Sequence, residues 1–258
     1  LVKLNLQNPA VKEHIFAAIS MWIDEFNIDG LRLDVAYSLD LGFLKELHSF
    51  CKSKKADFWL MGETLHGDYN RWLNPEMLDS VTNYECYKGL YSSFNDMNLF
   101  EIAHSLNRQF GSESWCLYRG KNLYSFADNH DVSRIASILK NKAHLPLVYT
   151  LLYTMPGIPS VYYGGEFGIL GDKSQGDKAL RPEFNKAAML ENGIADLREL
   201  LTKLNKLRNS SEALAYGDYT KLFLTNRQLA ISRKFEDKEI IAVINADENA
   251  FTFNLGGG

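Results

Sequence analysis

Helical segments alternate with short apolar runs along most of this 258-residue chain, and that alternation limits the folds open to it. After Asn8 and Pro9, which suit the start of a helix, apolar residues recur at the spacing of an amphipathic helix. A short apolar run follows, and the same two patterns then repeat. The strand candidates are residues 28–35, residues 57–63 and the runs near Ser80, Leu123 and Val161. Helices between short buried strands predict parallel strands joined by right-handed crossovers, which is an α/β fold.

The end of the chain has a different pattern. After a predicted helix at residues 195–208, short strand candidates follow one another with turn signals but without helices between them. These candidates are residues 220–225, 229–235, 239–246 and 250–255. Consecutive strands of this kind predict an antiparallel sheet. We therefore predict an α/β domain over residues 1–209 and the start of an all-β domain over residues 210–258.

Composition excludes several classes of protein. Hydrophobic residues make up 46% of the chain and charged residues 23%, which is typical of globular domains. A net charge of -4 without a run of Lys or Arg argues against a nucleic acid or an anionic membrane as partner. The apolar stretch around residues 145–155 is too short to span a membrane. Three cysteines are too few for a disulfide framework or a zinc site, so we expect reduced thiols and a cytoplasmic protein.

Carboxylates follow three of the predicted strands. Asp34 closes "GLRLD", Glu63 closes "WLMGE", and Asp131 follows "FADNH". Barrel enzymes build their active sites at the carboxyl ends of parallel strands, and the spacing allows these three residues to converge there. Arg32 precedes Asp34 by two residues and therefore points the same way on an extended strand. A single aspartate at a strand end is more often a helix cap, but three carboxylates with an arginine and a histidine favour a site.

Such a set suits the cleavage of an acetal with retention of configuration. That reaction needs an ionised carboxylate as nucleophile and a protonated one as acid, and a cation such as Arg32 would keep Asp34 ionised. The segments "DGLRLDVA", "MGETLH" and "FADNHDVSR" resemble, in this order, the second, third and fourth signature regions of the alpha-amylase family, glycoside hydrolase family 13. "LVKLN" resembles the fifth region, in the form typical of neopullulanases and cyclomaltodextrinases. "GIPSVYYGGE" resembles the last strand of the family's barrel.

The resemblance implies a role for each matching residue. Asp34 would be the nucleophile that forms a covalent glycosyl-enzyme, and Glu63 would be the general acid and base. Asp131 would bind and distort the sugar just before the scissile bond, with His130 donating a hydrogen bond to it. The other implied substrate contacts are Arg32, His66, Asp177 and Arg181, of which the last two also fit an ordinary loop ion pair. Where many relatives have Lys-His shortly after the nucleophile, this chain has Val35-Ala36-Tyr37.

The resemblance also implies which part of the fold is present. The family's first signature region normally precedes the segment that "LVKLN" resembles, so we expect units four to eight of a (β/α)8 TIM barrel and part of an antiparallel β domain. Open barrel edges expose unpaired strands, so we expect the chain alone to be inactive, and either to need the missing part of the barrel or to associate with another copy. The sequence shows no cofactor site. Calcium, where the family has it, often bridges the region ahead of the first motif.

The implied activity is retaining hydrolysis of α-glucosidic bonds, with an α-glucan oligosaccharide such as a maltodextrin as the partner. A non-catalytic amylase-like scaffold stays open as an alternative, although such a protein is expected to lose the carboxylates that this chain keeps. A glucan transferase with the same catalytic residues also stays open. Transfer depends on the exclusion of water, which motifs do not report.

Overall fold

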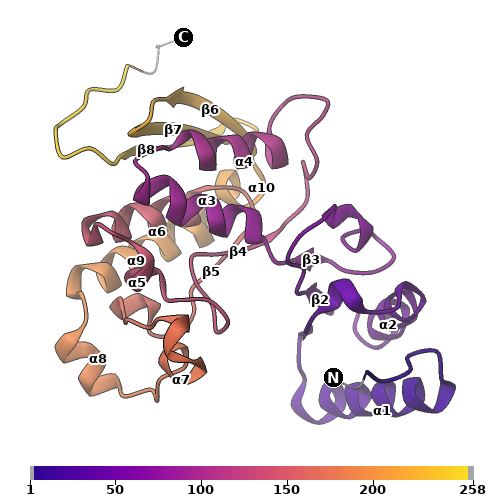
Figure 1. Cartoon of the computed structure of the whole chain (residues 1–258). Helices are drawn as coiled ribbons and strands as arrows, with labels where there is room; N and C mark the ends of the chain where they lie inside the picture. Colours follow the sequence, from indigo (N-terminus) through magenta and orange to yellow (C-terminus); the bar gives the residue numbers. More distant parts are fainter. Residues whose placement is uncertain (1–2, 255–258) are drawn as a thin grey trace. The chain divides into compact units, whose positions relative to one another are not determined.

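A computed structural model describes residues 3–254, and these residues form two compact units. The first unit runs as far as Tyr84 and includes the short segment Asn122–Tyr124. The second unit holds residues 85–121 and 125–254 of the described chain. Figure 1 follows both units along the sequence. Each unit is described by itself.

The first unit is an alternation of helices and parallel strands. Its elements are α1 (Pro9–Phe26), β1 (Gly30–Leu33), α2 (Leu41–Lys54), β2 (Trp59–Gly62) and β3 (Ser80–Val81), with short 3-10 helices at Ala36–Ser38 and Tyr69–Arg71. In the sheet, β2 lies between β1 and β3 and runs parallel to both. A further parallel bridge joins Thr82 to Tyr124. The chain therefore leaves β1 and β2 at the same edge of the sheet, immediately before Asp34 and Glu63.

Local chemistry explains the helices of this unit. The side chain of Asn8 accepts a hydrogen bond from the backbone N–H of Ala10 at 3.0 Å and caps α1, as predicted. Asp40 caps α2 in the same way through the N–H of Phe43 at 2.8 Å. The core of the unit is formed largely by apolar side chains of α2 and β2, with less than 10% of each exposed. They include Phe43, Leu44, Leu47, Cys51, Leu60 and Met61.

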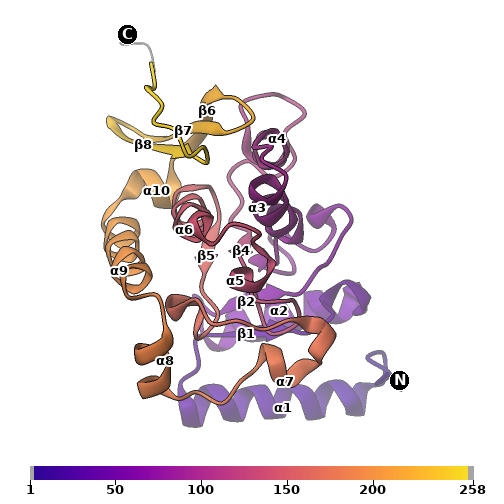
Figure 2. The ribbon, with the colours of Figure 1, turned by 60° about the vertical axis from the view of Figure 1, so that its left-hand side comes forward.

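The second unit begins with two helices that pack closely. α3 (Tyr84–Asn95) and α4 (Phe100–Phe110) lie side by side, and Figure 2 shows them from a second direction. Contact is close at Gly89, where an added Cβ would come within 3.0 Å of the Ile102 side chain. The elements that follow are β4 (Tyr124–Phe126), α5 (Ile135–Ile138), α6 (Leu145–Thr154), β5 (Ile158–Ser160), α7 (Asp177–Leu180), α8 (Lys186–Asn192), α9 (Ala195–Ser210) and α10 (Glu212–Tyr216). β4 pairs with β5.

The predicted antiparallel sheet is present, with three strands rather than four in the described residues. β6 (Asp218–Leu224), β7 (Gln228–Phe235) and β8 (Lys238–Asn245) pair in sequence order, each antiparallel to the next. The prediction of a strand at residues 250–255 is wrong for its described part, which has no strand. Phe251 and Phe253 instead pack their rings against Phe223, with centroids 5.5 and 5.6 Å apart. The alternation of apolar residues at 251 and 253 therefore reflects ring packing and not the pairing of a β-strand. The predicted domain boundary at residue 210 stays a prediction.

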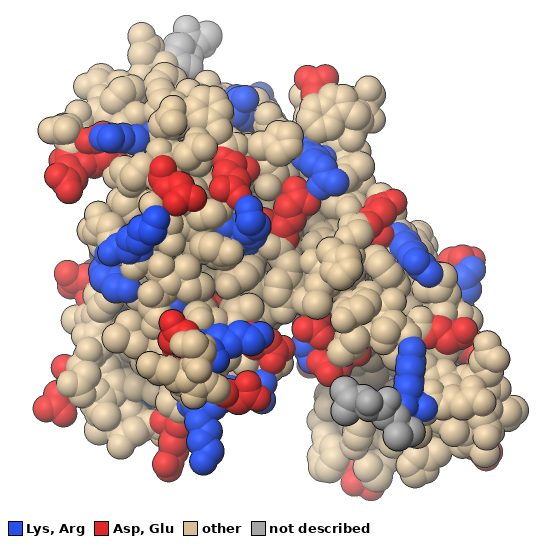
Figure 3. All heavy atoms as spheres, viewed as in Figure 1, with Lys and Arg blue, Asp and Glu red and all other residues tan. Residues whose placement is uncertain are grey.

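The surface carries charged side chains of both signs. Figure 3 shows acidic and basic side chains mixed over one face of the molecule. Within residues 3–254 no helix is long and apolar enough to cross a membrane. Cys51 and Cys86 are buried and Cys116 is partly buried, and all three are free thiols. Burial raises the pKa of the Cys51 thiol to about 11, which keeps it protonated.

Candidate active site

In the first unit, Arg32 joins two carboxylates. Its Nη1 atom pairs with Oδ1 of Asp34, and its Nη2 atom lies 3.3 Å from Oε2 of Glu63. The contact follows from the sheet, because the register pairs the last residue of β1 with the last residue of β2. The structure therefore brings together three residues that the sequence predicted to share a site.

The two carboxylates of this cluster differ in their surroundings. The side chain of Asp34 is 71% exposed, whereas that of Glu63 is 9% exposed. The backbone N–H of Val35 donates to Oε2 of Glu63 at 2.9 Å, and the Tyr84 hydroxyl lies 3.5 Å from Oε1. Glu63 is thus held on both oxygens in a largely buried position. Asp34 is open to a ligand.

The backbone at both strand ends is closely constrained. Val35 has φ 48° and ψ 42°, a left-handed conformation that β-branched residues rarely adopt. β1 ends at Leu33 and is shorter than the predicted residues 28–35; the left-handed Val35 prevents the strand from continuing to that residue. At the end of β2, a Cβ on Gly62 would come within 2.5 Å of Leu78 and 2.7 Å of Ala36. A side chain at this position, directly before Glu63, requires these neighbours to shift.

His66 lies in the loop after β2 and contacts the segment that follows the predicted nucleophile. Its ring centroid is 6.0 Å from that of Tyr37, and the two rings are tilted by 41°. Lys3 donates a hydrogen bond to the carbonyl of the neighbouring Ser38. Tyr37 and His66 thus form an aromatic pair in the same unit as the Arg32 cluster.

The second unit contains a cluster around Asp131. Nη2 of Arg181 lies 3.0 Å from Oδ1 of Asp131, and Nε2 of His130 lies 3.0 Å from Oδ2. Arg181 also donates from Nε to the carbonyl of His130 at 3.0 Å, and its Nη2 lies 3.7 Å from Asp177. Four predicted residues that lie up to 51 residues apart therefore meet in this unit.

Comparison with known proteins identifies the family of this chain. The family model "Alpha amylase, catalytic domain" matches residues 1–213. The chain belongs to the alpha-amylase family. It is 28% identical to a cyclomaltodextrinase of Thermoanaerobacter pseudethanolicus, over 94% of this chain and 42% of that protein. It is also 28% identical to a maltogenic alpha-amylase of Bacillus acidopullulyticus, over 98% of this chain and 43% of that protein. The chain thus spans less than half the length of these relatives.

Solved members of the family have the same fold. An alpha-amylase of Geobacillus thermoleovorans in complex with acarbose is 27% identical, with a TM-score of 0.80 over 94% of this chain and 54% of that one. A cyclomaltodextrinase structure is 27% identical, with a TM-score of 0.84 over 94% and 41%. These matches confirm the predicted fold class, which is part of the alpha-amylase (β/α)8 barrel followed by an antiparallel sheet.

Two expectations from the sequence stay predictions. Asp34 and Glu63 lie in the first unit and Asp131 in the second, so the convergence of all three carboxylates stays a prediction. Calcium in the full-length enzyme also stays a prediction; within residues 3–254, no group of three or more His, Cys, Asp or Glu is arranged to hold a metal ion. No step below uses one.

Sequence reasoning missed two features of this amylase-family chain. One is the left-handed Val35, whose N–H holds Glu63. The other is Arg134, which is fully buried although it lies in the quoted motif "FADNHDVSR". An arginine two residues after a valine in a polar segment carries no signal of burial. Apart from Asp128 in the same motif, its partners are carbonyls that lie 28 to 46 residues away in the sequence.

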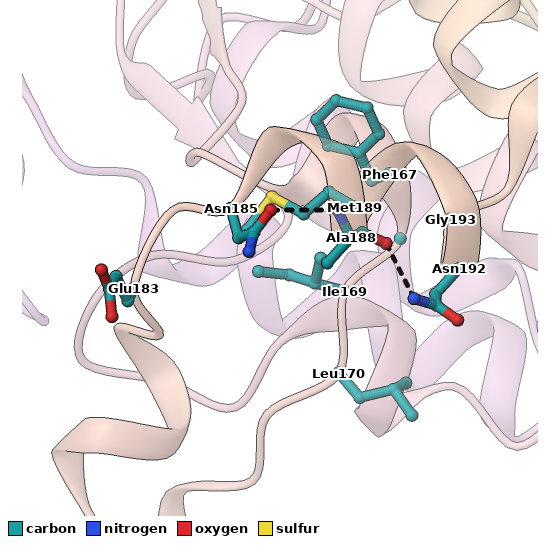
Figure 4. Close-up of a pocket in the computed structure, with 10 residues that line it drawn as sticks. Phe167, Ile169, Leu170, Glu183, Asn185, Ala188, Met189, Asn192 and Gly193 are labelled. Atoms are coloured by element: carbon teal, nitrogen blue, oxygen red, sulfur yellow. Dashed lines mark hydrogen bonds between the residues drawn. The ribbon is translucent and has the colours of Figure 1, made fainter.

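A separate apolar pocket lies beside α8 and contains none of the predicted site residues. It has a volume of about 330 Å³, and its lining includes Phe167, Ile169, Leu170 and Met189. Figure 4 shows these side chains around the pocket, with Asn185 and Asn192 bonded to the backbone of α8 and Glu183 at the edge. No ion pair of the Arg32 or Asp131 clusters extends into it. The pocket is therefore not part of the candidate active site.

Proposed function

We propose that this chain carries the nucleophile and the acid/base of a retaining α-glucan hydrolase. The observation that supports the proposal is the Arg32 cluster, in which one guanidinium contacts an exposed and a buried carboxylate at the ends of adjacent parallel strands. The names of the relatives, cyclomaltodextrinase and maltogenic alpha-amylase, favour maltodextrins and cyclic maltodextrins as substrates.

In this mechanism Asp34 attacks the anomeric carbon of the sugar. The bond from that carbon to the leaving oxygen breaks, and Glu63 gives its proton to the leaving oxygen. Glu63 then takes a proton from water, which attacks the same carbon and releases Asp34 as a carboxylate. Two carboxyl groups about 5 Å apart suit this double displacement, whereas a wider spacing suits inversion. A single guanidinium that contacts both groups favours the shorter spacing.

The Asp131 cluster supplies the proposed sugar contacts. The Asp131 carboxylate and the His130 ring can exchange hydrogen bonds with hydroxyl groups of the sugar that carries the anomeric carbon. Arg181 holds Asp131 through Oδ1 at 3.0 Å, so the carboxylate keeps one orientation while its second oxygen exchanges partners. Binding of this kind lowers the barrier when it is stronger in the transition state than in the ground state.

The test is the hydrolysis of maltoheptaose, cyclodextrin and pullulan by an active enzyme that contains this chain, followed by NMR. We expect products that are first released as α-anomers, because two displacements retain configuration. Initial β-anomers would contradict the assignment of Asp34 as nucleophile. Products longer than the substrate would indicate the transferase instead. Binding of maltoheptaose without any turnover would indicate the non-catalytic scaffold.

A further inference from the structure

We propose that Arg134 is the positioning residue of the Asp131 cluster, because its guanidinium fixes the three backbone segments that carry the cluster and its neighbours. The consequence for catalysis rests on the proposed function, but the positioning itself does not. Arg134 touches no reacting atom in this account. It acts on Asp131 and Arg181 through the chain.

Each nitrogen of the Arg134 guanidinium bonds to a different segment. Nε lies 3.0 Å from Oδ2 of Asp128, in the loop that follows β4. Nη1 donates to the carbonyl of Leu180 at 3.4 Å, at the end of α7. Nη2 donates to the carbonyl of Tyr163 at 2.8 Å and lies 3.4 Å from that of Tyr162, in the loop after β5. One rigid group thus ties together three segments.

Two of these segments lead directly to the Asp131 cluster. Asp128 begins the tetrapeptide that ends at Asp131, and Leu180 is the residue before Arg181. Arg181, which is partly exposed, donates hydrogen bonds to the His130 carbonyl and to the Asp131 carboxylate. The buried arginine fixes the backbone on both sides of the ion pair between Asp131 and Arg181, and the exposed arginine makes that pair.

The third segment places an aromatic pair beside the same cluster. The Tyr162 ring lies 4.7 Å from the guanidinium carbon of Arg134, and its centroid is 6.2 Å from that of His130. The Tyr163 hydroxyl donates to the carbonyl of Pro182, just after Arg181, at 2.7 Å. Arg134 therefore contacts three segments that adjoin His130 and Asp131 in this unit.

Burial separates this network from an ordinary surface ion pair. Arg134 is 0% exposed and Asp128 is 3% exposed. Burial raises the pKa of Asp128, while the Arg134 charge and the N–H of Ile135 act in the opposite direction. A buried ion pair stabilises a fold little compared with an apolar replacement, because both charges lose their hydration. A fully buried guanidinium with every nitrogen in use therefore indicates a geometric role.

Lysine cannot reproduce this geometry. Its ammonium group is a single point with three donors, whereas the guanidinium is a planar fork whose nitrogens face different directions. Arg134→Lys keeps the charge and loses the simultaneous contacts. Arg233→Lys is the matched control, since Arg233 is 3% exposed and donates to the carbonyls of Gly217 and Thr154, away from the cluster.

The experiment is hydrogen–deuterium exchange on the full chain, with NMR of the histidine rings. For Arg134→Lys we expect amide exchange to be faster by about tenfold or more at residues 128–131, 162–163 and 180–182, with β6 to β8 unchanged. The His130 ring signal, assigned with His130→Gln, should shift in Arg134→Lys and stay in place in Arg233→Lys. A merely stabilising residue would not move a native-state ring signal.

Two results would overturn the proposal. One is exchange and a His130 signal in Arg134→Lys that match those of the unchanged chain. The other is equal acceleration of the three segments in Arg233→Lys. If Arg134→Lys does not fold, Asp128→Asn is measured by the same criteria, because it removes the charged partner and keeps the volume. None of these readouts requires turnover, so loss of the proposed hydrolase function would leave their outcome intact.

Discussion

The Arg32 cluster and the Asp131 cluster both pair an arginine with carboxylates, but they differ in composition and in how they are assembled. In the first unit one arginine contacts two carboxylates, Asp34 and Glu63. In the second unit one carboxylate, Asp131, contacts an arginine and a histidine. The first cluster is assembled by the pairing of two neighbouring strands, while the second joins residues from loops 50 positions apart.

The two clusters therefore keep their geometry by different means. Backbone pairing between β1 and β2 fixes the first, so few side chains are needed to support it. Loops have no such ladder, and the second cluster depends on the buried guanidinium of Arg134. We therefore expect changes in the first unit to act on the chemical step, and changes in the second to act on the binding of the sugar.

The largest effect is expected for Glu63→Gln in an active enzyme that contains this chain. The amide cannot donate the proton that the leaving oxygen needs, so turnover of maltoheptaose should fall by about 100-fold to 10,000-fold. Steady-state kinetics measure it. Glu76→Gln, at an exposed ion pair with Lys45 in the same unit, is the control and should keep full activity. Near-normal turnover of Glu63→Gln would remove Glu63 from the chemical step.

A smaller and more discriminating effect is expected from two conservative changes. Arg32→Lys should lower kcat by about 100-fold, because a single ammonium cannot contact Asp34 and Glu63 as the fork does. Arg181→Lys should mainly raise KM, by about tenfold, because Asp131 loses its charge-assisted partner. Measurement of kcat and KM separately for maltoheptaose distinguishes the two effects. If both variants changed kcat and KM in the same way, the assignment of the first cluster to the chemical step and of the second to sugar binding would be wrong.

The smallest effect is a loss of stability. Gly62→Ala places a methyl group against Leu78 and Ala36, and overpacking of this kind costs about 1–3 kcal/mol. Urea unfolding measures the change in the free energy of unfolding. Ser53→Ala, at an exposed position of α2, serves as the control in the same unit. An unchanged unfolding midpoint for Gly62→Ala would show that the end of β2 is less tightly packed than the structure indicates.

Sequence reasoning succeeded where the signal was local. Asp34, Glu63 and Arg32 lie in short motifs at the ends of strands, and the parallel register then brings them together without further information. The Asp177 and Arg181 pair was also predicted, and its spacing of four residues suits one turn of helix. The placement of Asp131 relative to Glu63 stays a prediction.

It failed where tertiary contacts override a local pattern. Residues 250–255 alternate like a strand, but Phe251 and Phe253 pack on Phe223 instead of joining the ladder. The left-handed conformation of Val35 contradicts the preference of a β-branched residue and arises where the chain turns beside Glu63. Arg134 is buried where the carbonyls of Tyr162, Tyr163 and Leu180 accept its hydrogen bonds, and these residues lie far from it in the sequence. None of these three effects has a signature within a short window of sequence.

The most direct test of the account is to trap the covalent intermediate on Asp34. A fluorinated glucosyl substrate slows both displacements, and peptide mass spectrometry of an active enzyme that contains this chain then locates the sugar. The account predicts one adduct, on the peptide that contains Asp34, and none after Asp34→Asn. An adduct on Glu63 or on any other residue would contradict the assignment of nucleophile and acid on which the comparison of the two clusters depends.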